Sequence, residues 1–215
     1  EVDVTPQHVQ LMMNAGHELD VRVPRRTQLR AHSVSGTISV EGVEGSVDIE
    51  SGSGSLEVEG QPRSIHAMGF SGGVTVRGGG TEVTRAESIS GTVIITKAAG
   101  LVVAKSSSGG VDVRGSVKEA ELFSVSGSVV FDGSVASGGR LSAESSSGGV
   151  ELTLPRNMSA EYELSTISSD IENDFGPAAT KSRRSAGVSL KFTVGNGGAR
   201  IKAASVSGSV RLQDR

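Results

Sequence analysis

The chain has 215 residues, a formal net charge of -3, 35% hydrophobic residues, 30 glycines and 3% aromatic residues. It has no cysteine, which excludes disulfides and thiolate zinc sites, and its mild acidity argues against a nucleic-acid partner, which would need a basic face. No apolar run reaches the ~18 residues that would span a membrane, so we expect no membrane span in this chain. Because aromatic side chains are scarce, small β-branched residues must fill the core, which favours a narrow interior.

The first segment, residues 1–13, is predicted to cap the N-terminal end of the repeat that follows it. The chain begins with Glu1, so we expect a mature form or a trimmed piece, and no signal peptide is visible. Residues 14–32 are predicted to form a first coil. Leu19 and Val21 would lie in one inward row of that coil, and Leu29 and Ala31 in the other.

A four-residue phrase, first met as SVSG at 33–36, recurs along the rest of the chain. The steps between its second serines are 18, 18, 19, 18, 18, 21, 21 and 39 residues, and we interpret the last step as two coils with an insertion. A glycine follows each of these serines, except where Ser169 takes its place. Even repetition at this period is typical of stacked repeat architectures. The second serines are Ser35, Ser53, Ser71, Ser90, Ser108, Ser126, Ser147, Ser168 and Ser207.

Two rows of apolar residues accompany the phrase, and within each row the residues come in pairs spaced by two, which is the strand period. The first row follows the phrase: Ile38/Val40, Leu56/Val58, Val74/Val76, Val93/Ile95, Val111/Val113, Val129/Phe131 and Val150/Leu152. The second row precedes the next phrase: Val47/Ile49, Ile65/Ala67, Thr84/Ala86, Val102/Ala104, Ala120/Leu122, Leu141/Ala143 and Tyr162/Leu164. Every coil therefore carries two short strands with inward apolar residues.

This pattern predicts an all-β fold, a single-stranded parallel β-helix (β-solenoid) with about 18 residues per coil, which we expect to be right-handed. Coils stacked about 4.8 Å apart would bury each other's apolar rows and pair their backbones along the axis. The recurring phrase is predicted to form the corner of each coil. Serine can bond its own backbone there, while glycine tolerates a positive φ and allows stacked backbones to approach closely.

We expect one domain over residues 1–215, with regular coils over 14–171 and final coils over 188–215. The coils 124–144 and 145–165 are two or three residues longer than the others, and should bulge at ASGGR and LPRNMS. Residues 172–187 break the repeat with Gly, Pro and basic residues, and are predicted to form a surface excursion.

The phrase S-x-S-G-x-V-x-V, the stretch STISSDIENDF and the closing GNGGARIKAASVSGSVRL resemble a bacterial envelope family, the domain of unknown function 4097, which is described as an adhesin family. The resemblance covers about residues 15 to 213 and includes no catalytic motif. It implies a right-handed β-helix, export to the cell envelope, and a role in adhesion or in envelope-stress sensing. Residues 172–187 are the part least like the family.

Enzymatic chemistry is not expected on this scaffold, and we predict no catalytic, cofactor-binding or metal-binding residues. Outward carboxylates such as Glu41 and Glu59 should be neighbours, but we interpret them as part of a solvated charged face. Sugars lack an aromatic platform, because the chain has no Trp and Tyr162 falls in an inward row. The histidines His8, His17, His32 and His66 lack partners at metal-ligand spacing and are interpreted as solitary surface groups.

The serine columns and one basic cluster allow two other interpretations of the surface. Columns of serine along a flat solenoid resemble those of ice-binding proteins, but here they are Ser rather than Thr and adjoin a corner glycine. The cluster KSRR at 181–184 could contact an anionic lipid or polymer, although such runs are more often simply solvated.

Five outward apolar residues form the predicted interaction patch: Ile94, Leu101, Val103, Phe123 and Val130. Apolar groups that gather on a surface indicate a contact site. The patch would bind a protein or envelope polymer, mediate self-association, or be covered by the N-terminal segment or by KSRRSAGV. With the location and roles that the family resemblance implies, we expect an extracytoplasmic, non-enzymatic protein that presents a rigid repeat surface for adhesion or scaffolding. The alternative is a sensory ectodomain that binds a stress ligand or peptide, and a carbohydrate-active or ice-binding β-helix is more remote.

Overall fold

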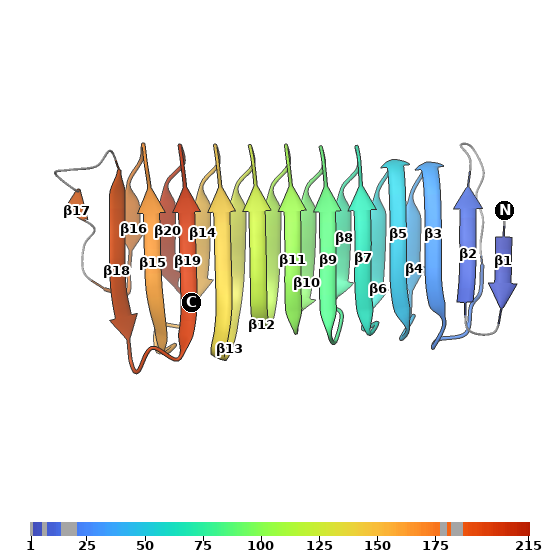
Figure 1. The fold of residues 1–215 in the computed structure, drawn as a ribbon, viewed down its shortest axis with the longest axis horizontal. Helices are drawn as coiled ribbons and strands as arrows, with labels where there is room; N and C mark the ends of the chain where they lie inside the picture. Colours follow the sequence, from blue (N-terminus) through green and yellow to red (C-terminus); the bar gives the residue numbers. More distant parts are fainter. Residues whose placement is uncertain (1, 6–7, 14–20, 177–179, 182–186) are drawn as a thin grey trace.

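The computed structural model describes residues 2–5, 8–13, 21–176, 180–181 and 187–215, and these residues form a rod of stacked β-coils (Figure 1). Within these ranges the chain contains strands, turns and bends, and no helix of the length and hydropathy needed to cross a bilayer. The all-β solenoid predicted from the repeat is confirmed. Its strands are β1 (Val2–Thr5), β2 (His8–Met13), β3 (Gln28–Ser35), β4 (Ile38–Glu41), β5 (Ser46–Ser53), β6 (Leu56–Gly60), β7 (Ser64–Gly69), β8 (Val74–Gly78), β9 (Val83–Ser88), β10 (Val93–Ala98), β11 (Leu101–Ser106), β12 (Val111–Ser124), β13 (Val129–Ser145), β14 (Val150–Leu154), β15 (Ala160–Thr166), β16 (Ile171–Asn173), β17 (Thr180–Lys181), β18 (Val188–Val194), β19 (Ala199–Ser205) and β20 (Val210–Asp214).

Both predicted apolar rows lie inside the rod. Along the first row, Val93 pairs in parallel with Val74 on one side and with Val111 on the other. Along the second row, Val102 pairs with Thr84 and with Ala120. These residues are at most 1% exposed. Short side chains suffice because the two sheets lie close together, which explains how a chain so poor in aromatic residues buries a continuous core.

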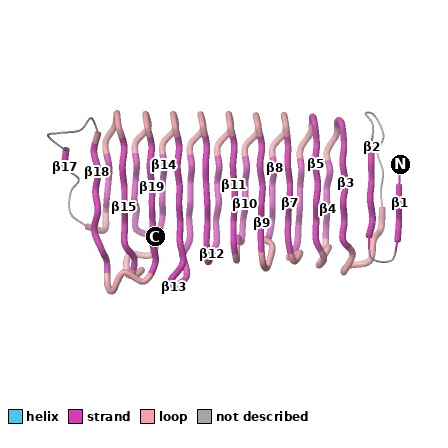
Figure 2. Tube along the Cα trace, viewed as in Figure 1, coloured by secondary structure: helices cyan, strands magenta, loops and turns pink. Residues whose placement is uncertain are grey.

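The coils turn at both long edges of the rod, and Figure 2 draws most of the upper turns as pink loops. At the lower edge β12 and β13 run continuously around the turn, and their register shifts where Lys118 lies opposite residues 136–139. The bulge expected at ASGGR is therefore present. Gly138 at this bulge has a φ of 76°, and a Cβ there would meet nothing within 4 Å, so the extra residues loop outward without disturbing the stack.

At the N-terminal end, β1 and β2 form an antiparallel hairpin, and β2 pairs in parallel with β3. Leu29 and Ala31 occupy the second inward row, as expected, and pair with Val47 and Ile49. Val21 lies outside any strand, so its predicted place in the first row is wrong, and Leu19 lies outside the described residues.

The order of the last coils differs from the order predicted. The final coil in the sequence, β19 and β20, is inserted between two earlier coils: β19 pairs with β13 and β15, and β20 pairs with β14 and β16. Strand β18, which we expected to resume the coils, instead runs antiparallel to β15 at the end of the rod. The 39-residue step is therefore one antiparallel strand plus a coil that folds back (Figure 1).

Outward charges favour part of this insertion. Arg211 of β20 lies between Glu151 of β14 and Glu172 of β16, and its Nε is 2.7 Å from a Glu172 carboxylate oxygen. Coils stacked in sequence order would place Glu151 directly opposite Glu172, and like charges opposite each other destabilise a sheet. The inserted coil also supplies Lys202, whose Nζ is 2.7 Å from Glu144 Oε1. Arg200 of the same coil opposes the trend, because it lies in register beside Arg140 of β13.

Aromatic side chains close the C-terminal end of the core. The rings of Tyr162 and Phe192 stack with centroids 4.8 Å apart and an interplanar angle of 6°, and Phe175 meets Tyr162 edge-on at 5.9 Å. Of the predicted excursion 172–187, strand β17 pairs with β18, while 177–179 and 182–186 lie outside the described residues.

Candidate functional site

The corners from Ser88 onward are mostly held by the buried first serine of the repeated phrase. The Ser124 hydroxyl donates a 2.9 Å hydrogen bond to the Gly109 carbonyl of the preceding coil, and accepts a 2.9 Å bond from the Gly127 amide of its own coil. The same pair of bonds recurs at Ser88, Ser106, Ser145 and Ser205. These buried serines tie their corners to the neighbouring coil, which gives these corners one shape.

The glycine of the phrase is required by close packing rather than by its φ at most corners. We expected a positive φ, and Gly36 has one at 117°, but Gly109 and Gly127 are not among the positive-φ residues. Instead, a Cβ on Gly109 would lie 2.2 Å from the Gly91 carbonyl oxygen, and a Cβ on Gly127 equally close to the Gly109 oxygen. Only a residue without a side chain fits beneath the preceding carbonyl.

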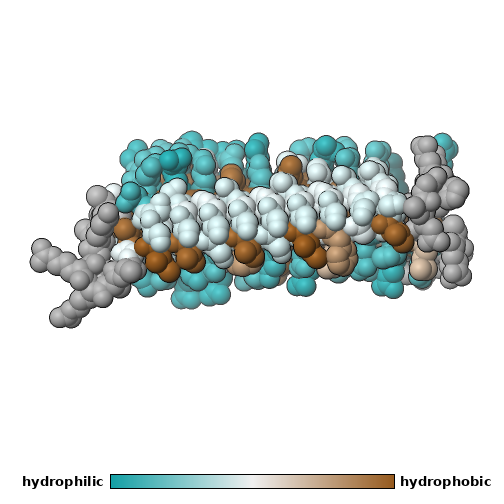
Figure 3. Space-filling view, turned by 90° about the horizontal axis from the view of Figure 1, so that it is seen from above, coloured by the Kyte–Doolittle hydropathy of each residue, from teal (hydrophilic) through white to brown (hydrophobic). Residues whose placement is uncertain are grey.

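The remaining corner residues form a continuous surface, which we call the corner strip. It consists of the last three residues of every phrase: 34–36, 52–54, 70–72, 89–91, 107–109, 125–127, 146–148, 206–208 and 167–169. None of these residues is charged. Figure 3 looks down on this corner and shows a pale band of Ser and Gly, a row of brown apolar side chains along it, and teal side chains on both flanks.

The apolar row of the corner strip comes from the variable residue of the phrase. These side chains are strongly exposed: Val34 54%, Phe70 48%, Ile89 43%, Val125 40%, Ile167 53% and Val206 46%. Our sequence reasoning missed this row, although the signal was present in the second letter of SVSG and SISG. Phe70 also corrects the expectation that the surface offers no aromatic group to a sugar.

A hollow of about 330 Å³, the corner groove, lies beside the C-terminal half of the corner strip. Its lining includes Phe123, Ala204 and Ser165 from one outward row, and Ser146, Val206 and Ile167 from the corner strip. Its charged member, Glu144, is already paired with Lys202, whose hydrogen bond lowers the pKa of that carboxyl. The described walls are therefore apolar groups and hydroxyls.

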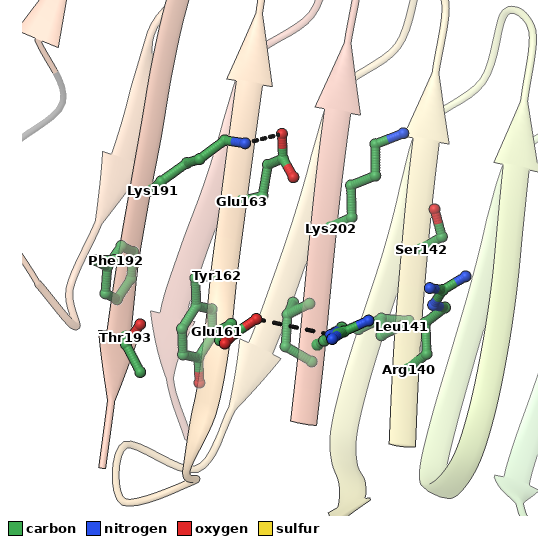
Figure 4. A pocket seen from close by; sticks show the side chains of 12 residues that line it. Arg140, Leu141, Ser142, Glu161, Tyr162, Glu163, Lys191, Phe192, Thr193 and Lys202 are labelled. Carbon is green, nitrogen blue, oxygen red and sulfur yellow. Dashed lines mark ion pairs between the residues drawn. The ribbon is translucent and has the colours of Figure 1, made fainter. Parts of the chain in front are cut away.

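A second and larger hollow, the charged groove, crosses the outer face of β13, β19, β15 and β18 and has a volume of about 590 Å³ (Figure 4). Its cations face carboxylates: Lys191 Nζ is 2.8 Å from Glu163, and Arg200 Nε is 3.7 Å from Glu161. Arg140 lies in register beside Arg200, so two guanidinium groups adjoin at one side of the groove. The arrangement suits a ligand that carries both signs of charge.

The structure separates the five residues of the predicted patch onto two faces. Ile94 and Val130 lie on one face with Asp112 between them, as expected for positions two coils apart. Leu101, Val103 and Phe123 lie on the other face.

Within the second group, only part of the predicted surface is open. Val103 is 7% exposed, because it sits in register between the longer Arg85 and Glu121. Leu101 adjoins Val83, which is 37% exposed and which the prediction omitted. Phe123 instead belongs to the corner groove, where Gly187 and Val188 from KSRRSAGV join it.

The histidines that the structure describes are not solitary. His32 Nδ1 is 3.5 Å from Glu50, and His66 Nδ1 is 3.2 Å from Asp48. The side chain of His8 and the whole of His17 lie outside the described part. Among the residues described, no three His, Asp or Glu side chains gather as metal ligands would.

Comparison with known proteins places the chain in a family. The family model described as Toastrack DUF4097 matches residues 4–213, which is nearly the full length. Neither the curated proteins nor the solved structures include a significant match to the chain.

Proposed function

The chain belongs to the Toastrack DUF4097 family, and we propose that it is a non-enzymatic protein of the bacterial cell envelope that presents its corner strip for adhesion or scaffolding. The proposal rests mainly on one observation. The corner strip runs the length of the rod without a charge, and carries a row of apolar side chains that are each at least 40% exposed. Gly52, Ser107 and Ser146 interrupt the row, but Phe70 adjoins Ile89 and Val206 adjoins Ile167. Exposed apolar side chains that gather on one surface mark interaction sites.

Rigidity supports the same proposal, because a surface that binds an extended partner must hold its spacing. Backbone hydrogen bonds join every pair of neighbouring coils, and ion pairs on the outer faces join them again. Arg30 Nε lies 3.0 Å from Asp48 of the next coil, and Lys105 Nζ lies 2.7 Å from Glu121. Such surface pairs each contribute little to stability, but they keep the charged faces solvated and distinct from the neutral corner.

The proposal is tested by sedimentation of the purified protein with bacterial envelope fragments. We expect the wild type to sediment with the fragments, and the variant Val125→Glu/Val206→Glu to remain in the supernatant, because burying two new carboxylates against a partner is costly. Val83→Glu is the matched control, since Val83 is 37% exposed and Val125 is 40% exposed but only Val125 lies on the corner strip. The proposal would be overturned if the wild-type protein stayed in the supernatant, or if Val125→Glu/Val206→Glu and Val83→Glu lost binding equally.

The charged groove favours one alternative, a sensory ectodomain that binds a peptide or stress ligand. A peptide with both signs of charge could displace the exposed pairs Lys191–Glu163 and Arg200–Glu161 and make its own. The two functions respond to opposite substitutions. Arg140→Glu should abolish binding of such a peptide and spare sedimentation with envelope fragments, whereas Val125→Glu should do the reverse.

A further inference from the structure

We infer that the corner strip and the corner groove together bind one chain of an uncharged, hydroxyl-rich polymer, a neutral polysaccharide. This inference rests on the proposed function, since it uses the same surface, and it names the chemical class of the partner. Four properties of the corner lead to it: its charge, its hydroxyl array, the walls of the groove and the area available.

The charge of the corner excludes the common charged partners. A polyanion or a nucleic acid is bound through Lys and Arg, and the strip has neither. The outward row that borders it on the long face carries Glu50, Glu87 and Glu144 beside Lys105, and this mixed row offers little attraction to anionic lipid headgroups. A neutral partner can contact an uncharged strip without the cost of desolvating a charge on either side.

The hydroxyl array matches the chemistry of sugars. Each coil places one outward serine on the strip, so hydroxyls recur about every 4.8 Å along the rod. A serine hydroxyl both donates and accepts hydrogen bonds, as sugar hydroxyls do. Glycine beside each serine keeps the band low, so that a chain on the serines can also touch the apolar row. Phe70, 48% exposed, offers a ring face to the apolar side of a sugar ring.

The corner groove provides a binding site for a sugar unit beside the C-terminal half of the corner strip. Phe123, Val206 and Ile167 contribute apolar groups to its lining, and Ser146 and Ser165 contribute hydroxyls. Its volume of about 330 Å³ is within the range of small-molecule sites, roughly 300–1,000 Å³. Because Glu144 is engaged by Lys202, the groove presents no free charge among its described lining.

The area of the strip disfavours a second copy of this chain as the occupant. Corners stacked about 4.8 Å apart give a strip of roughly 40 Å by 10 Å, so two strips face to face would bury about 800 Å² in total. Stable protein interfaces bury about 1,200–2,000 Å². A linear polymer makes many weak, repeated contacts instead, and gains avidity from their number.

Electrophoresis in native gels that contain a polysaccharide tests the inference. The neutral probes are dextran, hydroxyethyl cellulose and soluble starch, and polygalacturonate is the charged one. We expect at least one neutral polymer to retard the wild type, and polygalacturonate not to. Val125→Glu/Val206→Glu should raise the apparent Kd about tenfold or more, and Phe70→Ala should raise it severalfold. The control Val83→Glu should behave as wild type.

Several outcomes would overturn the inference. Retardation by none of the three neutral polymers would do so, as would retardation by polygalacturonate alone or equal losses in Val125→Glu/Val206→Glu and Val83→Glu. Three other activities are also measured: thermal hysteresis, binding to anionic vesicles, and dimerisation in sedimentation velocity. If the wild type shows one of them and Val125→Glu/Val206→Glu abolishes it, ice, a membrane or a second copy is the partner and the polysaccharide is rejected. The wild type could still sediment with envelope fragments while no neutral polymer binds. That result would reject the polysaccharide as the partner and leave the proposed adhesion function in place.

Discussion

At the scale of single residues, one backbone oxygen decides what can stand at each corner. The carbonyl of one corner glycine points at the Cα of the glycine in the next coil, and the buried serine hydroxyl binds the same oxygen, as Ser124 binds that of Gly109. Serine and glycine are therefore required together. The serine supplies the bond and the glycine supplies the room, which explains why the two residues recur as a unit in this chain.

We predict that Gly109→Ala and Gly127→Ala each lower the free energy of unfolding by more than about 2 kcal/mol, because a Cβ would force the stacked backbones apart. Gly138→Ala is the control: its φ of 76° strains alanine by about 1 kcal/mol, but a Cβ there meets nothing within 4 Å. Urea denaturation measures all three. Equal losses at Gly109 and Gly138 would contradict the close approach at the corner.

Tyr162 carries a buried hydroxyl for which the described structure offers no partner, and burial raises its pKa to about 12. Tyr162→Phe should therefore leave the free energy of unfolding unchanged or raise it by about 1 kcal/mol at neutral pH. The wild type should lose stability as the pH rises from the ordinary tyrosine pKa of 10.0 through about 12, since the unfolded chain releases its proton first. The variant should lack this loss.

Because Tyr162 is the one tyrosine in the chain, the absorbance of phenolate reports its titration directly. A folded protein that forms phenolate near pH 10 would contradict its burial. Lower stability of Tyr162→Phe at neutral pH would show that the hydroxyl has a partner.

At the scale of elements, outward charges distinguish coils whose inward residues are alike. The inward residues of neighbouring coils are nearly interchangeable, because Val, Ile, Leu and Ala occupy the same rows throughout. The outward charges differ from coil to coil. Strands β19 and β20 carry Arg200, Lys202 and Arg211, and their neighbours offer Glu144, Glu151, Glu161 and Glu172 as well as Arg140. We therefore expect the carboxylates to favour the inserted order.

We predict that Arg211→Glu lowers the melting temperature more than Arg211→Gln does, since it would place Glu between Glu151 and Glu172. Arg85→Glu serves as the control, because Arg85 pairs in register with His66 and Val103, which are not acidic. Thermal unfolding followed by circular dichroism gives the three melting temperatures. A similar drop for Arg211→Glu and Arg85→Glu would indicate that charge does not order the coils.

At the scale of the whole molecule, the middle of the rod behaves as a linear array in which each coil contacts its neighbours. Removing one complete coil should then preserve the rest. Residues 106–123 are such a unit, because Phe123 at its end lies in register with Lys105 just before its start. Within the unit, Val111 pairs with Val93 of the preceding coil and with Val129 of the following one.

We predict that deletion of residues 106–123 leaves a shorter folded solenoid, whereas deletion of Val111 alone is more damaging. The coil deletion brings Lys105 beside Glu144, an opposite-charge pair, and keeps both inward rows aligned. The single deletion shifts the rest of that strand so that its inward side chains face solvent. Circular dichroism and urea denaturation compare the two. An unfolded coil deletion beside an intact single deletion would contradict the register.

The sequence by itself determined the coil, the two inward rows and the corners, because these follow from the polarity and size of residues at a constant period. The rows from Ile38 to Leu152 needed no knowledge of distant segments, since each coil pairs with the one before it. The bulge at ASGGR was visible as extra residues in one coil. The pattern also identified the corner glycines and gave two reasons for them, a positive φ and the close approach of stacked backbones. It could not tell that the second reason, a carbonyl in another coil, applies at most corners.

Only the tertiary structure decided the place of the last coil and the shape of the candidate site. Periodicity fits the coil of Ile201 equally well at the end of the rod or between Leu141 and Tyr162, and the side chains that meet this coil are known only after stacking. The corner groove depends on that insertion, which brings Val206 next to Ile167 and into one lining with Phe123. A surface built from segments far apart in the chain has no signature in either segment alone, since contact energies between them arise only in the folded state.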